Sequence, residues 1–564
     1  MSLSQTQKID FFPLQARALA PYLILTLAVF AAYGNIFDND FVFDDNLTIG
    51  INTYLQGWGH IGDILTSSTT NGAHIVGGFY RPLQILLYLF AFHLGNGDAF
   101  WFHALNLALH IANTCLVYRL GVKLGFVPKG VFLAALIWSV HPIHTEAVTY
   151  MSGTADPLCA FFCLSAIIVL LPDFSFRKIL AVIPLFLLGL VSKETMVMFP
   201  LLVMACLFYV SPQRLNPRSY FRTWPLWIIA LVYAYWRTHA EGFDGPQTYA
   251  HFYGLPAFSP LKDYAAHPLY RFTTFLATLP QYLQLLIWPT HLHMERSFFV
   301  QTSFKSGFVA GGIVIVAFAA GHIVYSCRTV FGGSGKLRPP PQKSGDGQRQ
   351  AERYLELSWG FLWFAAAHAP DTGLLVPMNS LFLEHWMYLP SVGLFLGLAQ
   401  TIVVLTKRLP KATPVVCYAA ALIFAFVLSI KTYEQNKIWH DPVSFYENIF
   451  ANGETSPRAR NNLALYYANR GQFDEAIEQF NQAISGADIY AETRYNLAVT
   501  YLRKSEDAEN IEKAIKNLQR SLEIQPDFYR SYQTLGDIYG TLLHNGEMAD
   551  YYHSRGKAIF DQQK

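Results

Sequence analysis

The chain has 564 residues, of which 52% are hydrophobic, 15% aromatic and only 14% charged, against about 25% charged in ordinary soluble domains. This composition excludes an ordinary soluble protein and predicts that most of the chain lies in lipid. The net charge of +2, with lysine and arginine scattered through short loops, argues against a nucleic-acid-binding surface. The six cysteines lie within or at the edges of apolar runs, which indicates small core residues and no disulfide framework.

Eleven apolar runs are long enough, or nearly long enough, to cross a bilayer as helices. The first follows Lys8 and Arg17 and lacks a clear small-residue cleavage site, so we interpret it as an uncleaved span and not as a signal peptide. Two further runs, 83–94 and 272–288, either span the membrane or lie at its interface. The eleven predicted spans are 18–36, 100–122, 130–142, 157–172, 177–191, 195–210, 223–237, 307–326, 355–369, 386–406 and 412–431.

Lysine and arginine residues orient these helices, because inner loops carry the excess of positive charge. If both ambiguous runs stay on the outer side, every basic loop falls on the inner side, including the Gly/Pro-rich loop at 332–350. Counting only 83–94 as a span would place most of this charge outside, and if both runs cross, the loops between them turn outward. We therefore expect eleven spans and an outer face made of 37–99, 143–156, 192–194, 238–306, 370–385 and all residues from 432.

The soluble tail repeats with a period of about 34 residues. Asn462-Leu463-Ala464 recurs as Asn496-Leu497-Ala498, 34 residues on, and Leu497 recurs as Leu535, 38 residues on, with an acidic insert expected around 505–510. This period is typical of tetratricopeptide repeats, which are stacked helix pairs that bind peptides or partner proteins. We predict about three repeats, the last one degenerate. The expected domains are a transmembrane domain 1–431, a connecting helical segment 432–454 and a repeat domain 455–564.

The polar clusters that can carry chemistry nearly all fall on the predicted outer face. Asp44 and Asp45 open the first outer loop, and neighbouring carboxylates raise each other's pKa unless a cation or a hydrogen-bond donor compensates. One is expected to act as a general base and the other as its orienter or as a ligand. On this motif alone a solvated loop is the simpler interpretation, and the rest of the chain reverses that preference.

Three further clusters stand near the predicted membrane surface. Arg81 either snorkels to lipid headgroups or grips a phosphate. Lys193 and Glu194 lie between two spans, where ionisable residues are costly and therefore indicate function, so Lys193 is a second phosphate-binding candidate. Glu384 and His385 either anchor an aromatic belt or face the outer leaflet.

The segment from His141 through His144 to Glu146 ends the third predicted span, and Asp156 follows it. The His-x-x-His spacing is compatible with zinc, but Pro142 disfavours a helical ligand face and no cysteine lies on this side. We therefore expect no divalent metal and a hydrogen-bonded network beside an anionic substrate. Acids and bases converging on one membrane face suit an enzyme with a lipid-phosphate donor, which needs cations for the leaving phosphate and a carboxylate for the nucleophile.

The ordered motifs FVFDDN, YRPL, FHALNLALH, HPIHTEAV with GTAD, SKET and EHWMYLPS, followed by tetratricopeptide repeats, resemble the transmembrane and tetratricopeptide-repeat O-mannosyltransferases and their bacterial relatives. These belong to the GT-C glycosyltransferases, and the resemblance spans nearly the whole chain. It implies an all-α polytopic fold and inverting transfer of a sugar, with mannose expected, from a polyprenyl-phosphate donor to a hydroxyl on the outer or lumenal side. By this resemblance Asp44 matches the base, and Asp45 assists it.

Two residues depart from the family pattern. Thr154 stands where relatives carry arginine in a Gly-Arg-Ala-Asp segment, and His385 stands where an arginine follows the glutamate. The loss of two cations leaves open how the donor phosphate is held. The candidate replacements are Arg81, Lys193, His141, Arg237 and Arg271, with His144, Glu146, Asp156, Glu194, Glu384 and His385 as a supporting network.

In the expected mechanism Asp44 accepts the proton of a Ser or Thr hydroxyl, while Arg81 and Lys193 stabilise the departing phosphate. The expected partners are the lipid-linked donor, an acceptor protein presented by the repeats, and membrane lipids, with no nucleic acid. One alternative is a transferase acting on a glycan or a lipid, and another is a non-catalytic scaffold that assembles an envelope complex. Three repeats and few cysteines favour a bacterial cytoplasmic membrane with a periplasmic active site; the endoplasmic reticulum is the eukaryotic equivalent.

Overall fold

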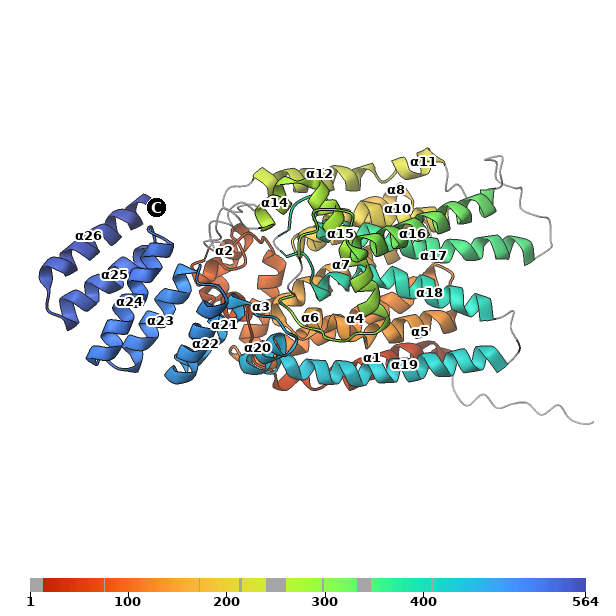
Figure 1. Ribbon diagram of the computed structural model, residues 1–564. Helices are drawn as coiled ribbons and strands as arrows, with labels where there is room; N and C mark the ends of the chain where they lie inside the picture. The colour runs from red at the N-terminus through yellow and green to blue at the C-terminus, as the bar shows by residue number, and fades with distance from the viewer. Residues whose placement is uncertain are drawn as a thin grey trace, which may run out of the picture.

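The computed structural model describes residues 14–563 apart from 76, 172, 212–215, 240–259, 297–298, 332–345, 379, 407–409 and 411. In this part of the chain every regular element is helical, which confirms the predicted all-α fold. Figure 1 shows long helices running side by side in one bundle, with the shorter helices of the tail extending from one end of it. Most of the predicted inner loop at 332–350 lies outside the described residues.

Each of the eleven predicted spans coincides with a helix or a pair of short helices. The described helices of the bundle are α1 (Leu14–Tyr33), α4 (Ala99–Lys123), α5 (Pro128–Ser139), α7 (Ala155–Leu170), α8 (Phe176–Ala181), α9 (Ile183–Leu190), α10 (Phe199–Val210), α12 (Trp224–His239), α16 (Gly307–Phe331), α17 (Asp346–His368), α18 (Pro390–Thr406) and α19 (Ala412–Asn436).

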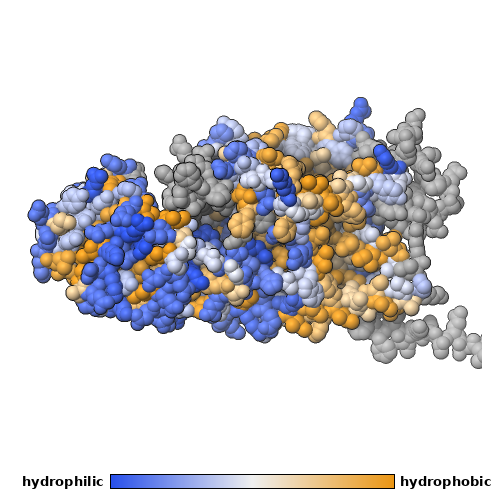
Figure 2. Space-filling model, in the orientation of Figure 1, coloured by the Kyte–Doolittle hydropathy of each residue, from blue (hydrophilic) through white to orange (hydrophobic). Residues whose placement is uncertain are grey.

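Length and composition identify fewer complete spans than eleven. In the described chain four helical segments are long and apolar enough to cross a membrane, and a fifth results if Pro128–Ser139 and Pro142–Val148, bent by 52°, form one span. Several other apolar helices are shorter, so the count of eleven is not established. Val314, Val415 and Phe426 each keep 67% of their surface exposed, and Figure 2 shows hydrophobic residues gathered over the bundle and hydrophilic ones over the tail. These apolar outer surfaces support a membrane protein.

The two ambiguous runs form α3 (Pro82–Gly95) and α15 (Pro268–Ile287). The 14 residues of α3 are too few to span a bilayer. The 20 residues of α15 are long enough, but they include Arg271, three threonines and two glutamines, and the helix is not apolar enough to qualify as a span. By length and composition neither helix qualifies as a complete span. The N-terminal end of each carries an arginine, Arg81 before α3 and Arg271 in the first turn of α15.

Helices α17 and α18 approach each other closely because glycines line their contact. A methyl group at Gly360 would lie 2.6 Å from the carbonyl oxygen of Gly393, and one at Gly397 would lie 2.8 Å from the carbonyl oxygen of Glu356. Gly393 and Gly397 form a Gly-x-x-x-Gly pair, the pattern by which small residues let helix backbones approach in membranes. Because α18 begins at Pro390, shortly after Glu384 and His385, this helix contact also helps to position those two residues.

Replacing Gly360 with alanine is expected to destabilise the protein by about 1–3 kcal/mol, because the new methyl group meets a helix backbone that cannot move without shifting α18. Gly321→Ala on α16 is the matched control, since no atom lies within 4 Å of the methyl group there. Thermal unfolding of the detergent-purified variants measures the difference. Equal unfolding midpoints for the two variants would contradict the close contact.

The tail consists of three helix pairs, as the repeat period predicts. They are α21 (Pro457–Asn469) with α22 (Phe473–Gly486), α23 (Ala491–Lys504) with α24 (Ala508–Ile524), and α25 (Tyr529–Asp537) with α26 (Gly546–Gln563). The recurring residues Leu463, Leu497 and Leu535 are all buried.

The four extra residues of the second repeat lengthen its helices and not the loop between them. Helices α21 and α22 have 13 and 14 residues, whereas α23 and α24 have 14 and 17. The loop within each of these two pairs has three residues, 470–472 and 505–507. The predicted insert at 505–510 therefore lies half in this loop and half in the first turn of α24. In the third pair, a π-helical turn at Ile538–Leu542 follows α25, in agreement with a degenerate repeat.

The segment between bundle and repeats packs tightly against the first outer loop. Its helix α20 (Pro442–Ala451) contributes Phe445, Tyr446 and Ile449 to a buried cluster that also contains Val42, Tyr150, Trp439 and two residues of α21. At the end of α19 the Asn436 amide donates to the carbonyl of Ala32 at 2.9 Å. The first repeat helix is thereby held beside the loop that carries Asp44 and Asp45.

Candidate functional site

A tight turn orients the two adjacent carboxylates of the first outer loop. Phe43 has a φ of 53°, a left-handed conformation that is costly for a bulky residue and is found mostly where surrounding structure enforces it. The carbonyl of Asp44 then accepts hydrogen bonds from the amides of Leu47 and Thr48 at 3.0 Å. The Asp44 residue is exposed, whereas Asp45 is 1% exposed.

Asp45 anchors this turn to the segment at 150–154. Its Oδ1 accepts hydrogen bonds from the amide and the hydroxyl of Ser152, both at 2.7 Å, and its Oδ2 accepts from the amide of Val42 at 3.2 Å. Burial raises the pKa of Asp45 to about 7, although these hydrogen bonds favour its ionised form. With all its partners supplied by the protein, Asp45 orients the loop and does not face solvent.

Asp44 can accept a proton from a group that arrives from solvent. The surrounding protein partly desolvates its carboxyl and raises its pKa above the ordinary value, while the Arg458 guanidinium opposes the shift. The nearby Tyr150 hydroxyl remains protonated, because burial and the charges of Asp44 and Asp45 raise its pKa. An exposed carboxyl with a raised pKa is suited to general-base chemistry.

Two of the cations predicted from the sequence, Arg81 and Lys193, form ion pairs with nearby carboxylates. Arg81 binds Glu194 through two hydrogen bonds, Nε to Oε2 at 3.0 Å and Nη2 to Oε1 at 2.6 Å. Lys193 Nζ lies 2.6 Å from Asp156 Oδ1, with only 3% of its side chain exposed. Burial by itself lowers the pKa of Lys193, but Asp156 and Asp371 raise it above its ordinary value, so the ammonium stays charged.

His385 joins this pair to Glu146. Its Nδ1 lies 2.9 Å from Glu146 Oε1, and its Nε2 lies 4.0 Å from Asp156 Oδ2. The other oxygen of Glu146 accepts the amides of Glu384 at 2.7 Å and His385 at 3.0 Å. An imidazole therefore lies between two carboxylates at one of the positions where the sequence departs from the family pattern. At the other, the Thr154 hydroxyl donates to the carbonyl of Met151 at 2.6 Å.

Glu384 is held by a segment that the sequence analysis did not single out. Its Oε1 accepts hydrogen bonds from the amide of His293 at 3.0 Å and from Arg296 Nη2 at 2.9 Å. Burial raises the pKa of Glu384, against the opposing effect of Arg296. The adjacent Glu295 binds Ser456 Oγ at 2.8 Å and also contacts Arg458. The segment 293–296 thus links the ion-pair network to the Asp44 side of the site.

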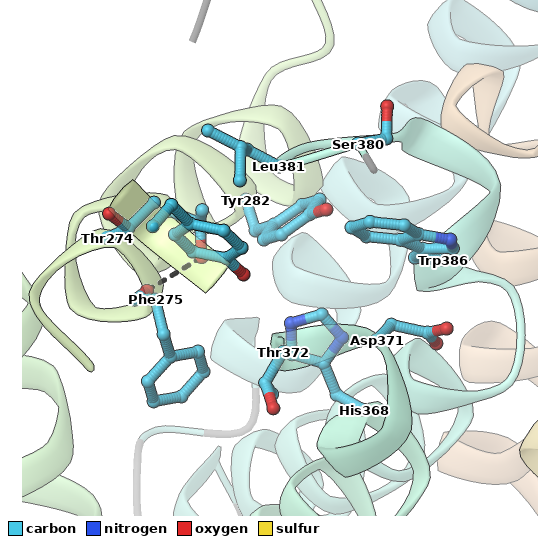
Figure 3. Close-up of a pocket in the computed structure, with 11 residues that line it drawn as sticks. Thr274, Phe275, Tyr282, His368, Asp371, Thr372, Ser380, Leu381 and Trp386 are labelled. Atoms are coloured by element: carbon cyan, nitrogen blue, oxygen red, sulfur yellow. Dashed lines mark hydrogen bonds between the residues drawn. The ribbon is translucent and has the colours of Figure 1, made fainter. Parts of the chain in front are cut away.

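Two pockets meet at Asp371 and Trp386. Figure 3 shows the first, with the side chains of Tyr282 and Trp386 in its upper part and His368 and Asp371 below them. The second is lined by Asp371 and Trp386 together with Asp156 and mainly apolar side chains of the α7, α10 and α18 regions. Burial raises the pKa of Asp371 to about 7, and Lys193 opposes this shift. The first pocket thus combines aromatic and polar walls, and the second offers mainly apolar walls beside the Lys193–Asp156 pair.

The structure does not bring every predicted residue into this network. His141 is fully buried, with Nε2 3.2 Å from the carbonyl of Leu286 and Nδ1 accepting from the amide of Ile143. His144 is fully buried between the rings of Trp138 and Tyr388. Both rings are closed off from solvent, so the predicted roles of His141 in phosphate binding and of His144 in the supporting network stay predictions.

The two remaining candidate arginines lie in separate surroundings. Arg237 Nη2 donates to the carbonyl of Gly78 at 2.8 Å, near the loop that leads to Arg81. Arg271 makes no ion pair or side-chain hydrogen bond with any residue in the described ranges. Within the same ranges no group of three or more His, Cys, Asp and Glu side chains is arranged to hold a metal ion.

Sequence reasoning missed Tyr150, Glu295, Arg296, Asp371 and Arg458. A partial signal was present for two of them, because the charged pair Glu295-Arg296 follows the apolar α15 in the predicted outer face. Arg458 gave no such signal, since an arginine in the first turn of a repeat helix reads as a solvated surface residue.

Comparison with known proteins gives matches over the repeats and over most of the chain. A tetratricopeptide-repeat family model matches residues 457–485. Human protein O-mannosyl-transferase TMTC4 is 31% identical over 177 residues, which cover 27% of this chain and 23% of that protein. Drosophila melanogaster protein O-mannosyl-transferase Tmtc1 is 22% identical over 551 residues, covering 83% and 62%, and human TMTC1 is 23% identical over 463 residues, covering 74% and 49%.

The matched segments thus span less than two-thirds of the length of these relatives. The two longest of these matches nevertheless extend over most of this chain, and a repeat model independently matches its tail. These comparisons support membership of the chain in the family of transmembrane and tetratricopeptide-repeat proteins named O-mannosyl-transferases.

Proposed function

We propose that this protein is an inverting glycosyltransferase that moves a sugar, with mannose as the leading candidate, from a polyprenyl-phosphate donor to a Ser or Thr hydroxyl of a protein. The observation that carries the proposal is the exposed Asp44 carboxyl, tied through residues 293–296 to a cluster of ion pairs on the same side of the bundle. The relatives' names, protein O-mannosyl-transferase, support the reaction class.

The proposed reaction is a single displacement. The acceptor hydroxyl gives its proton to Asp44 while its oxygen forms a bond to the anomeric carbon of the sugar. The bond from that carbon to the phosphate oxygen breaks at the same time, and the phosphate leaves with the electron pair on its polyprenyl carrier. The anomeric configuration inverts because attack and departure occur on opposite faces.

The leaving phosphate requires cations, and two kinds are available. Arg81 and Lys193 are already paired with Glu194 and Asp156, so a phosphate must share them with these carboxylates. Arg271 has no carboxylate partner in the described ranges and can bind a phosphate without displacing one. By analogy with oxyanion donors, each contact that forms in the transition state stabilises it by about 3–4 kcal/mol.

The apolar carrier and the protein acceptor need surfaces of different kinds. The second pocket suits part of a polyprenyl chain, because mainly apolar side chains line it beside Asp156. The repeats, which begin next to Asp44, suit an extended protein segment. We propose that both act on the outer or lumenal face, which in a bacterium is the periplasmic face of the cytoplasmic membrane.

Removing the second and third repeats is expected to abolish transfer to protein acceptors and to leave transfer to short peptides. Truncation after Gly486 keeps α21 and α22, so Ser456 and Arg458 stay in contact with Glu295. A deletion from residue 455 removes these contacts as well, and so cannot separate acceptor binding from damage to the site. Retained transfer to both kinds of acceptor would contradict a presenting role for the repeats.

A second candidate is the non-catalytic scaffold. It is favoured by the pairing of Arg81, Lys193 and Arg296 with carboxylates, which leaves few cations ready for a phosphate. A scaffold has no requirement for an exposed carboxyl with a raised pKa at the junction with the repeats, so the transferase is the better account of Asp44.

A transfer assay separates the two candidates. Purified full-length protein is incubated with polyprenyl-phosphate mannose and a pool of unfolded secreted-protein peptides, and mass spectrometry detects added hexose. Hexose on Ser or Thr that depends on the donor supports the proposed function. If no hexose appears with mannose or with other polyprenyl-linked sugars, the scaffold is the better account.

A further inference from the structure

The first repeat helix reaches into the site that contains Asp44. Arg458, in the first turn of α21, forms an ion pair with Glu295, and its guanidinium lies 5.6 Å from the centre of the Phe43 ring. Ser456 donates to the other oxygen of Glu295 at 2.8 Å and accepts the amide of Ala459 at 3.2 Å, so one hydroxyl caps α21 and binds Glu295. The start of the repeat domain is therefore fixed to Glu295 and to the residue before Asp44.

Glu295 is itself held in place by the segment between bundle and repeats. The carbonyl of Leu292 accepts hydrogen bonds from the amides of Gln435 at 3.0 Å and Asn448 at 3.1 Å. His291 lies 3.1 Å from Asn452, and His293 lies 3.4 Å from Glu454. With Arg296 bound to Glu384 on the other side, Glu295 has little freedom to follow Arg458 if α21 moves.

The groups that face Asp44 come from five parts of the chain. They are its neighbour Asp45, Tyr150 on the following outer segment, Glu295, Tyr446 on α20, and Arg458 on α21. Two of these are acidic and two are tyrosines, and Arg458 supplies the positive charge. Arg458 therefore opposes the neutralisation of Asp44 that the desolvation of its carboxyl and the two acids favour.

We propose that Arg458 is a positioning residue of the catalytic centre: through Glu295 and Phe43 it holds the first repeat helix against the Asp44 turn and keeps the Asp44 carboxylate ionised to receive the acceptor proton. The repeat domain then completes the site, beyond any part it plays in binding the acceptor. This inference rests on the proposed function, because it takes Asp44 as the base.

Removing the positive charge of Arg458 is expected to change the pKa of Asp44 in a definite direction. The pKa of Asp44, already above its ordinary value, rises further, so the acid limb of the activity profile moves to higher pH. A nearby opposite charge favours the ionised form of a carboxyl, so its loss moves this limb in one direction only. Removing the negative charge of Glu295 shifts the limb to lower pH, because Glu295 raises the pKa of Asp44.

The test compares Arg458→Met, Arg458→Lys and Glu295→Gln in the full-length protein, with Arg460→Met as the matched control. Arg460 lies on the same helix but packs on Phe450 at 4.0 Å and bonds Gln479 at 2.9 Å, away from Glu295. Two quantities are measured against pH: hexose transfer to a short peptide, and the rate at which a carbodiimide and an amine label Asp44, read by peptide mass spectrometry. The labelling needs no enzymatic activity, so it reports on Asp44 even if transfer fails.

Arg458→Met is expected to move both profiles to higher pH, Glu295→Gln to move them to lower pH, and Arg458→Lys and Arg460→Met to leave them near the wild type. Unchanged labelling of Asp44 in Arg458→Met, or shifts of the same sign in Arg458→Met and Glu295→Gln, would overturn the inference. If labelling shifts as expected while the wild type transfers no hexose from any donor, the positioning of Asp44 by Arg458 is supported and the proposed function fails.

Discussion

Asp44→Asn is expected to lower the rate of sugar transfer by about 10²–10⁴-fold, because the amide cannot accept the proton of the acceptor hydroxyl. The turn should persist, since its hydrogen bonds use the backbone carbonyl of residue 44 and not its side chain. Single-turnover transfer followed by mass spectrometry measures the loss, and thermal unfolding checks the fold.

Asp38→Asn is the matched control for this variant. Asp38 is an exposed carboxyl of the same loop, six residues before Asp44, and we expect its replacement to leave transfer unchanged. An Asp44→Asn protein that keeps more than a tenth of the wild-type rate would show that another group accepts the proton.

Lys193→Met is expected to have the second largest effect, on both activity and stability. In the proposed mechanism it removes a phosphate ligand, for which a loss of about 10²–10³-fold in turnover is typical of a transition-state donor. It also leaves Asp156 partly buried without its cation, and breaking a buried pair in this way costs about 3–5 kcal/mol.

The double variant Lys193→Met/Asp156→Asn separates these two effects. With both charges removed, most of the lost stability should return, while transfer should remain low because the phosphate still lacks its ligand. Lys504→Met, which breaks an exposed ion pair with Asp474 in the repeats, serves as a control and should change neither quantity measurably. Recovery of transfer along with stability in the double variant would show that Lys193 only neutralises Asp156.

The sequence predicts the helices and the repeat period well because both depend on local patterns. Apolar runs of sufficient length become helices in any context that buries them, and Leu463, Leu497 and Leu535 recur where helix pairs must pack. The convergence of Arg81, Lys193, Asp156 and their partners was also predictable, since charged residues at the outer ends of spans lie at similar depths.

Other features depend on packing that no local pattern reveals. His141 and His144 end a predicted span, but the chain bends by 52° there and turns both rings into the core. The contact of Glu295 with Arg458 joins residues 163 positions apart. Glu295 lies in a predicted outer loop and Arg458 in a soluble repeat. Neither position in the sequence indicates the other, so only the folded structure shows that the two residues meet beside Asp44.

The most direct test of the account is the structure of the full-length protein bound to a non-transferable polyprenyl-phosphate-mannose analogue, determined by cryo-electron microscopy. The account predicts the phosphate within ion-pair distance of Lys193, Arg81 or Arg271, the carrier running past Trp386, and the anomeric carbon facing Asp44. A donor bound with its phosphate away from all three cations, or with its sugar turned from Asp44, would contradict the account that the phosphate-binding cations and the Asp44 base form one site.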